Sequence, residues 1–409
     1  MQALQGVKIV DLSRALSGPF CTMVLADLGA DVIKIESGPD GDMSRTWGPF
    51  DRGVSTYYLS CNRNKRGMCI DLRNPKGLAT LQQLIDDADV VIENFKPGTL
   101  HSMGLGYEVL SARNPRLVLG SINAFGADGP MSSWPGFDQI AQGYSGLMSL
   151  TGFGDGDPTR TGTAIGDLTS GMWLVTAVLG ALLERERSGR GQHVSTSLLA
   201  SLVGLLSVHG QRYLSLGDVP RRTGNAHSVI APYGVFQTLD GPLNLAPITS
   251  AMWGRLCILL DLPGLPDDPR FATNDARVER RDELRDILED RLKTRSKREW
   301  TALFVDAGLP AGPINTLDEV FADPQVLHSQ LTETLTHPTL GALRQVVTPV
   351  FGSTASGASR PPPLLGEHTV EILREAGFDS ASINALLDAK VVFQDSADSP
   401  CTQSTGTAQ

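Results

Sequence analysis

The sequence predicts an α/β protein with an open, doubly wound sheet and a second, smaller α+β domain. Its 409 residues exceed the usual length of a single domain. Strand-like and helix-like segments alternate through residues 1–130, and a polar linker at residues 220–232 precedes a region with a different pattern. Alternating strands and helices form parallel βαβ units, which build doubly wound sheets.

Short apolar runs predict the strands of the first half, at residues 7–12, 31–36, 68–72, 89–95 and 117–123. Helical patterns cover residues 20–28, which end at Gly29, and residues 76–88. Ligands of such sheets bind beyond the carboxyl ends of the strands. The residues that follow Leu12, Glu36, Leu72 and Phe95 are therefore candidate ligand contacts.

The second half begins with a long predicted helix at residues 167–187, a strand at 192–197 and an apolar helix at 198–216. Beyond the linker, residues 233–245 predict a hairpin around Asp240-Gly241, and residues 277–304 predict charged surface helices. We place the smaller domain at roughly residues 233–326 and a last helix at 369–376. The polar tail from Gln394 is predicted to be disordered.

Composition excludes several classes of function. A formal net charge of −10 argues against non-specific nucleic-acid binding, which needs a broad basic surface. The longest apolar runs, 172–183 and 198–208, are shorter than the ~20 residues that span a bilayer. The N-terminus lacks the pattern of a signal peptide, and the five cysteines form no CxxC pair, so we expect a cytoplasmic protein. The seven histidines lack metal-ligand spacing, so no metal is expected.

Asp167 is the sharpest candidate for chemistry. It follows a glycine-rich stretch and opens the predicted helix at residues 167–187. Its commoner role would be an N-cap, because aspartate accepts a backbone hydrogen bond there. Its alternative role is a catalytic carboxylate, which a helix N-terminus would keep ionised and supply with donors for an oxyanion.

Two other segments have both an ordinary and a functional interpretation. Residues 62–67 place three cations in a loop before a strand, where they form either a solvated turn or a phosphate site. Residues 93–98 end a strand and could hold an adenine or an amide, or be a simple strand exit. Residues 221–227 are interpreted as a plain basic linker. A dinucleotide fingerprint, a P-loop and a G-x-S-x-G elbow are all missing from the sequence.

Taken together, these segments resemble the family III CoA-transferases, which include formyl-CoA and carnitine CoA-transferases and, as a relative, α-methylacyl-CoA racemase. The resemblance runs from Leu4 to about Phe378. Its markers occur in order at residues 4–12 (LQGVKIVDL), 18–19 (GP), 25–36 (LADLGADVIKIE), 64–66 (NKR), 93–98 (ENFKPG), 191–192 (GQ), 224–225 (GN), 310–313 (PAGP) and 366–369 (GEHT).

The resemblance implies a homodimer of two open monomers threaded through each other like linked rings. It implies a large, Rossmann-like CoA-binding domain at residues 1–225 and 331–393, a small inserted domain at 226–330 and a tail at 394–409. Coenzyme A would be a substrate rather than a tightly bound cofactor. The partners would be an acyl-CoA and a carboxylic acid, with no nucleic acid and no membrane.

The resemblance also assigns site residues, with Asp167 as the catalytic aspartate. CoA would lie along Leu16, Ser17, Ser37, Ile70, Asp71, Leu72, Arg73, Asn94, Phe95, Lys96 and Ser102, and the site would be closed by Trp134, Pro135, Gly136 and Phe137. Ser37 and Ser102 stand where formyl-CoA transferase has arginines, so phosphate contacts are expected at Arg73 or Lys96 instead. Leu16 replaces a glutamine of that enzyme.

The implied reaction moves CoA through an anhydride and then a thioester on Asp167. The alternative is a racemase or epimerase, which needs a proton-transfer group on each face of the α-carbon. The racemases carry a histidine where this chain has Phe137, and phenylalanine cannot titrate. A third hypothesis is a non-catalytic CoA-binding protein, which would tolerate the loss of Asp167.

Overall fold

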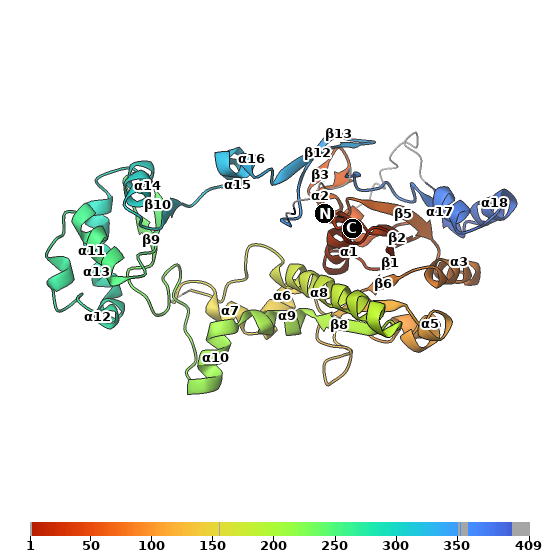
Figure 1. Cartoon of the computed structure of the whole chain (residues 1–409), viewed down its shortest axis with the longest axis horizontal. Coiled ribbons are helices and arrows are strands. Elements are labelled where there is room, and N and C mark those ends of the chain that lie inside the picture. Colours follow the sequence, from red (N-terminus) through yellow and green to blue (C-terminus); the bar gives the residue numbers. More distant parts are fainter. Residues whose placement is uncertain (1, 155, 351, 353–358, 395–409) are drawn as a thin grey trace, which may run out of the picture. The chain divides into compact units, whose positions relative to one another are not determined.

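The computed structural model describes residues 2–154, 156–350, 352 and 359–394 (Figure 1). The chain forms two compact units. The first comprises Met1–Leu147, Thr161–Gln211 and Gln330–Gln409, and the second comprises Met148–Arg160 and Arg212–Ser329. Each unit has its own buried apolar core, so each is described by itself.

A seven-stranded sheet in the order β14-β5-β2-β1-β6-β7-β8 forms the centre of the first unit. Its parallel strands are β1 (Lys8–Asp11), β2 (Asp31–Ser37), β5 (Lys65–Ile70), β6 (Val90–Glu93), β7 (Val118–Asn123) and β8 (His193–Ser197). The edge strand β14 (Val392–Phe393) runs antiparallel to β5. The strand order reverses between β1 and β6, and such a switch point is where open α/β sheets bind ligands.

Helices cover both faces of this sheet, as the predicted doubly wound fold requires. On one face lie α1 (Ser17–Asp27) and α8 (Ile165–Ser188), which bury apolar side chains against β1, β6 and β7. On the other face lie α3 (Pro75–Asp86), α5 (Tyr107–Arg113), α17 (Thr369–Glu375) and α18 (Ser380–Asp388). The two apolar clusters make a three-layer α/β/α unit.

Among the described residues, α8 alone has the length and composition of a membrane-spanning helix. Half of its most apolar window is buried inside the protein. Leu174 and Val178 are fully buried in the cluster that α8 shares with the sheet. Core helices of globular proteins pass the same test, so the apolar character of α8 is explained by its packing.

Shorter elements complete the first unit: η1 (Met43–Thr46), β3 (Phe50–Asp51), β4 (Val54–Ser55), α2 (Thr56–Leu59), α4 (Thr99–Ser102), α6 (Asp138–Tyr144), α9 (Leu198–Leu205), β12 (Thr332–His337) and β13 (Gly341–Val346). Two helices, α7 (Leu147–Leu150) and α10 (Ser207–Leu216), each run from the first unit into the second.

The second unit packs helices against a three-stranded antiparallel sheet in the order β11-β10-β9. Its strands are β9 (Gly234–Gln237), β10 (Pro242–Leu245) and β11 (Ala311–Pro313). Its helices are α11 (Ser250–Leu259), η2 (Leu265–Asp267), α12 (Asn274–Glu279), α13 (Arg281–Leu292), α14 (Lys297–Asp306), α15 (Leu317–Ala322) and α16 (Pro324–His328). Fourteen buried apolar residues, including Trp253, Trp300 and Phe304, form its core.

Most predicted elements are confirmed, including the hairpin around Asp240-Gly241, but two differ. The strand predicted at residues 68–72 is β5, which begins at Lys65 and ends at Ile70. The helix predicted at 198–216 is two helices, because Ser207 adopts a left-handed backbone with φ 41°. The helix α18 and the hairpin β12–β13 were not predicted. The tail beyond Gln394 lies outside the described residues.

Candidate active site

The loops that follow β1 and β6 meet at the switch point of the sheet. Asn94 follows β6, and its side-chain oxygen accepts a hydrogen bond from the backbone N–H of Arg14 at 2.8 Å. Its side-chain nitrogen donates to the Arg14 carbonyl at 2.8 Å and to Ser17 Oγ at 3.2 Å. The Arg14 guanidinium lies 5.0 Å from the centre of the Phe95 ring. Ser17, Asn94 and Phe95, all predicted CoA contacts, are thus brought together.

Buried ion pairs stabilise the loop that follows β1. Lys65 Nζ lies 3.1 Å from Asp11 Oδ2, and Lys34 Nζ lies 2.9 Å from Asp42 Oδ2. Lys34 also donates to the Ser13 carbonyl at 2.9 Å, and Asp42 accepts from the Ala15 N–H at 3.1 Å. Burial opposes ionisation of Asp11, but the two lysines and hydrogen bonds from Ser13 and Thr22 together outweigh it and hold the pKa of Asp11 below its ordinary value. This network fixes the backbone where CoA is expected to bind.

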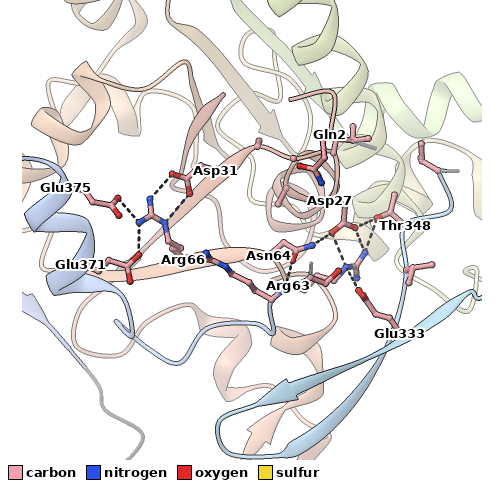
Figure 2. Close-up of a pocket in the computed structure, with 18 residues that line it drawn as sticks. Gln2, Asp27, Asp31, Arg63, Asn64, Arg66, Glu333, Thr348, Glu371 and Glu375 are labelled. Carbon is pink, nitrogen blue, oxygen red and sulfur yellow. Dashed lines mark hydrogen bonds and ion pairs between the residues drawn. The ribbon is translucent and has the colours of Figure 1, made fainter. Parts of the chain in front are cut away.

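The three cations of residues 62–67 are neither a solvated turn nor a phosphate site. Arg63, Lys65 and Arg66 are each at most 6% exposed, and Lys65 and Arg66 belong to β5 rather than to a loop. Figure 2 shows the two arginines beside a pocket. The pocket has a volume of about 520 Å³, and Asp31 and Arg66, near the amino ends of β2 and β5, line it. Their carboxylate partners are Asp27 and Glu333 for Arg63, and Asp31, Glu371 and Glu375 for Arg66. Their charges are therefore neutralised within the unit.

Asp167 occupies the first turn of α8, but it is not the N-cap. The helix begins at Ile165 after the N-cap Ala164, so Asp167 is its third residue and the capping interpretation is wrong. The cap comes from Asp138, the first residue of α6. Asp138 Oδ1 accepts from the backbone N–H of Gly166 at 2.7 Å and of Asp167 at 3.4 Å. These amides are engaged by Asp138, so they are not free oxyanion donors.

The surroundings of Asp167 favour its neutral form. Burial, followed by the nearby charge of Asp138, raises the pKa of Asp167 to about 7. Burial and Asp138 thus oppose the ionisation that the helix N-terminus was expected to favour. Tyr57 of α2 lies near the same carboxylates. Burial, followed by the charge of Asp167, raises the pKa of Tyr57 to about 12. The ring of Trp47 packs edge-on against Tyr57, with centroids 5.1 Å apart.

The remaining predicted contacts differ in how accessible they are. Ile70 is 0% exposed, so its side chain belongs to the core and only its backbone could meet a ligand. The Arg73 side chain is 83% exposed. Among the described residues it pairs with Asp71 alone, with 4.0 Å between Arg73 Nε and Asp71 Oδ1. Lys96 and Ser102 are exposed, and four residues are half-buried: Leu16, Ser37, Asp71 and Leu72. Arg73 and Lys96 are thus accessible cations.

The segment predicted to close the site is largely exposed. Trp134 is 51% exposed and Phe137 is 64% exposed, while Pro135 is exposed and Gly136 is half-buried. The Trp134 ring packs edge-on against Phe125 and Tyr144, each 6.2 Å away between centroids. A side chain at Gly136 would come within 2.6 Å of Ala124 Cβ. Glycine is therefore required at this position.

Sequence reasoning missed three residues of this site: Arg14, Tyr57 and Asp138. Asp138 lies 28 positions before Gly166 in the chain, so no local capping pattern could reveal it. Arg14 lies two residues after Leu12, close to the end of a strand where the sheet topology predicted a contact with the ligand. Tyr57 lies in a segment without any catalytic motif.

Comparisons with known proteins agree on one family. The sequence model of CoA-transferase family III matches residues 4–369. The human succinyl-CoA:glutarate CoA-transferase is 42% identical over 397 residues, which cover 96% of this chain and 91% of the human protein. The succinate–glutarate CoA-transferase of Agrobacterium fabrum is 41% identical over 91% of this chain and 95% of its own length.

An enzyme with another acid in its name and a solved structure are also similar to this chain. The acetyl-CoA:oxalate CoA-transferase of Acetobacter aceti is 37% identical over 78% of this chain and 82% of its own length. The crystal structure of a CaiB/BaiF family protein from Brucella suis is 41% identical, covers 91% of this chain and 99% of its own, and superposes with a TM-score of 0.83. The chain therefore belongs to CoA-transferase family III and is an enzyme that moves coenzyme A between an acyl-CoA and a carboxylic acid.

Proposed function

We propose that this enzyme transfers CoA from succinyl-CoA to a dicarboxylic acid such as glutarate, with Asp167 as the nucleophile. The position of Asp167 carries the proposal. Its carboxylate lies in the first turn of α8, and no hydrogen-bond donor to it is recorded among the described residues. One turn further, a side chain at Gly171 would meet the Ser17 carbonyl at 2.8 Å, so α8 packs against the start of α1. Asp167 is thus one helical turn from the contact between α8 and the predicted CoA-binding segment, which supports its proposed role.

The proposed reaction has two covalent intermediates. The Asp167 carboxylate attacks the thioester carbonyl of succinyl-CoA, the C–S bond breaks, and CoA thiolate leaves an aspartyl–succinyl anhydride. The thiolate then attacks the aspartyl carbonyl, which releases succinate and leaves an aspartyl-CoA thioester. The acceptor carboxylate repeats both steps in reverse order and restores the Asp167 carboxylate. No water is consumed, and the free energy of the thioester is conserved.

The named relatives support the choice of substrates. The human, Agrobacterium and Acetobacter enzymes are named for glutarate and oxalate, both dicarboxylic acids. The human enzyme is also named for succinyl-CoA as the donor. The racemase alternative has no support in this site, because exposed Phe137 cannot carry a proton where a racemase would need one.

Substrate transfer can be tested directly. The protein is incubated with succinyl-CoA and a panel of mono- and dicarboxylic acids, and new CoA esters are identified by mass spectrometry. We expect glutaryl-CoA to form and succinate to appear in equal amount. Deuterium uptake at the α-carbon in heavy water, without any new ester, would instead support the racemase.

We also propose that the protein is an interlocked homodimer. On the first unit, six large apolar side chains remain exposed on three consecutive helices: Met172, Trp173, Leu183, Val203, Leu205 and Val208. Exposed apolar patches of this kind mark protein interfaces. Sedimentation should show a dimer that persists on dilution, because linked rings separate only when a chain opens. An active monomer would contradict the proposal.

We also propose that the protein is located in the cytoplasm. Four described cysteines, Cys21, Cys61, Cys69 and Cys257, are buried free thiols, which suits a reducing compartment. Fractionation of cells that produce the protein, with its activity as the readout, tests this point. Activity found mainly outside the cytoplasmic fraction would contradict it.

A further inference from the structure

We propose that Asp138 is a positioning residue that holds Asp167 in the first turn of α8, and that its charge shifts the pH range of the reaction. This inference rests on the proposed function, because it concerns the same nucleophile. Asp138 is 8% exposed and begins α6, which packs against both α8 and α9.

One oxygen of Asp138 binds the start of α8. Asp138 Oδ1 lies 2.7 Å from the Gly166 nitrogen and 3.4 Å from the Asp167 nitrogen. A side chain at Gly166 would come within 2.9 Å of Asp138 Oδ1 and 3.0 Å of Leu202. The absence of a side chain at position 166 is therefore what allows the carboxylate to reach the helix.

The other oxygen ties Asp138 to the segment that leads into α8. Asp138 Oδ2 accepts from Gln142 Nε2 at 2.6 Å, and Gln142 is 0% exposed. Gln142 Oε1 in turn accepts from the Thr161 N–H at 3.0 Å and from its hydroxyl at 3.3 Å. Asp138 is thus held from both sides and cannot rotate away from Asp167.

The charge that acts on Asp167 is that of Asp138, which faces it from α6 and disfavours its ionised form. Tyr57 of α2 and Cys61 are also nearby, but burial raises the pKa of both, so they are neutral at pH 7. The packed elements α1 and α9 approach the first turns of α8 through Ser17 and Leu202, which are uncharged. No cation in the described part of the chain is recorded against Asp167. The helix amides that could offset this are already engaged by Asp138.

A less acidic nucleophile has a direct effect on the proposed reaction. The Asp167 carboxylate is a stronger nucleophile once it is ionised, but it becomes ionised only at a higher pH. The charge of Asp138 therefore moves the acid limb of the activity towards higher pH.

The test is the pH profile of kcat/KM for Asp138→Asn. Wild-type enzyme should lose activity below about pH 7, where Asp167 becomes protonated. In Asp138→Asn this acid limb should move down by about one pH unit or more, since a like charge has been removed. Asp138→Glu keeps the charge and should keep the limb in place. Asp87→Asn, at an exposed carboxylate after α3, is the matched control and should change nothing.

A second variant allows for misfolding of the first. The amide that Asp138→Asn introduces would present a donor to Gln142. The double variant Asp138→Asn/Gln142→Glu therefore restores an acceptor for both that amide and Thr161, while it moves the charge away from Asp167. Its acid limb should also move down. An unmoved limb in either active variant would overturn the proposal and leave a purely structural role for Asp138.

A measurement independent of turnover completes the test. Infrared difference spectra between wild type and Asp167→Asn report the titration of Asp167 itself. A midpoint near pH 7 is expected for the wild type, and the same comparison made in the Asp138→Asn background should give a lower midpoint. Equal midpoints in the two backgrounds overturn the proposal. A wild-type enzyme that transfers no CoA at any pH would instead refute the proposed function, whatever the titration shows.

Discussion

The side chain of Asn94 forms hydrogen bonds with both backbone groups of Arg14, each at 2.8 Å. Asn94 follows β6 and Arg14 follows β1, so this pair joins the two loops at the switch point of the sheet. The same side chain donates to Ser17 Oγ at 3.2 Å. One amide therefore sets the shape of the surface on which CoA is proposed to lie.

Asn94→Ala should weaken CoA binding more than it weakens the fold. The lost hydrogen bonds free the loop after β1, and we expect KM for succinyl-CoA to rise about ten-fold with little change in kcat. Asn114→Ala is a matched control. The Asn114 side chain also donates to a backbone carbonyl, that of Ala88, at 3.0 Å, but Asn114 precedes β7 and so lies at the amino ends of the strands. An equal rise in KM in both variants would contradict this role.

Asp167→Asn should abolish transfer while leaving CoA affinity within about two-fold of wild type. The amide keeps the size of the side chain but cannot act as a nucleophile. Because Asp138 rather than Asp167 caps α8, the substitution leaves the helix start intact. Steady-state transfer and calorimetric titration with CoA check both parts. Substantial turnover by this variant would refute the assignment of Asp167.

The stability of the protein should also report on Asp167. Its pKa in the folded state is raised from 3.8 to about 7, so folding favours the protonated form. The stabilisation from this group is present below its unfolded pKa and is lost as the pH rises towards 7. Asp167→Asn should therefore raise the melting temperature at pH 8 by a few degrees and hardly at all at pH 4. An equal change at both pH values would exclude the linkage.

Much of the fold could be predicted from local patterns, because β1, β2, β6 and β7 are short apolar runs that alternate with helices. The start of β5 could not be predicted so easily. Lys65 and Arg66 look like surface residues, yet they are buried by partners as distant as Glu371. Lys65 is neutralised by Asp11, 54 positions away, and Arg66 partly by Glu371, 305 positions away, and no local pattern encodes such contacts.

The site shows the same division between local and long-range information. Asp167 could be proposed as the nucleophile because its position and the family markers are local in the sequence. Its electrostatic setting could not, since the capping carboxylate is Asp138 on another helix. The prediction of an ionised Asp167 assumed that the helix amides were free, and Asp138 already occupies them.

Incubation with succinyl-CoA should leave a chemical mark on Asp167, which is the most direct test of the covalent mechanism. An anhydride or thioester at this side chain is an activated carbonyl, so hydroxylamine should convert it to a hydroxamate and borohydride should reduce it. The mark should map to the peptide that contains residues 165–167. A carboxylate that serves only as a general base is never acylated and would survive both reagents.

The controls for this experiment separate chemistry from accessibility. Free CoA alone should give no adduct, because no activated carbonyl forms without an acyl donor. A good acceptor acid should reduce the amount of adduct, since it discharges the intermediate. Asp138 lies beside Asp167 and should stay unmodified, because its oxygens are engaged by Gly166 and Gln142. Turnover of succinyl-CoA with Asp167 unmodified under rapid quenching would refute the covalent route.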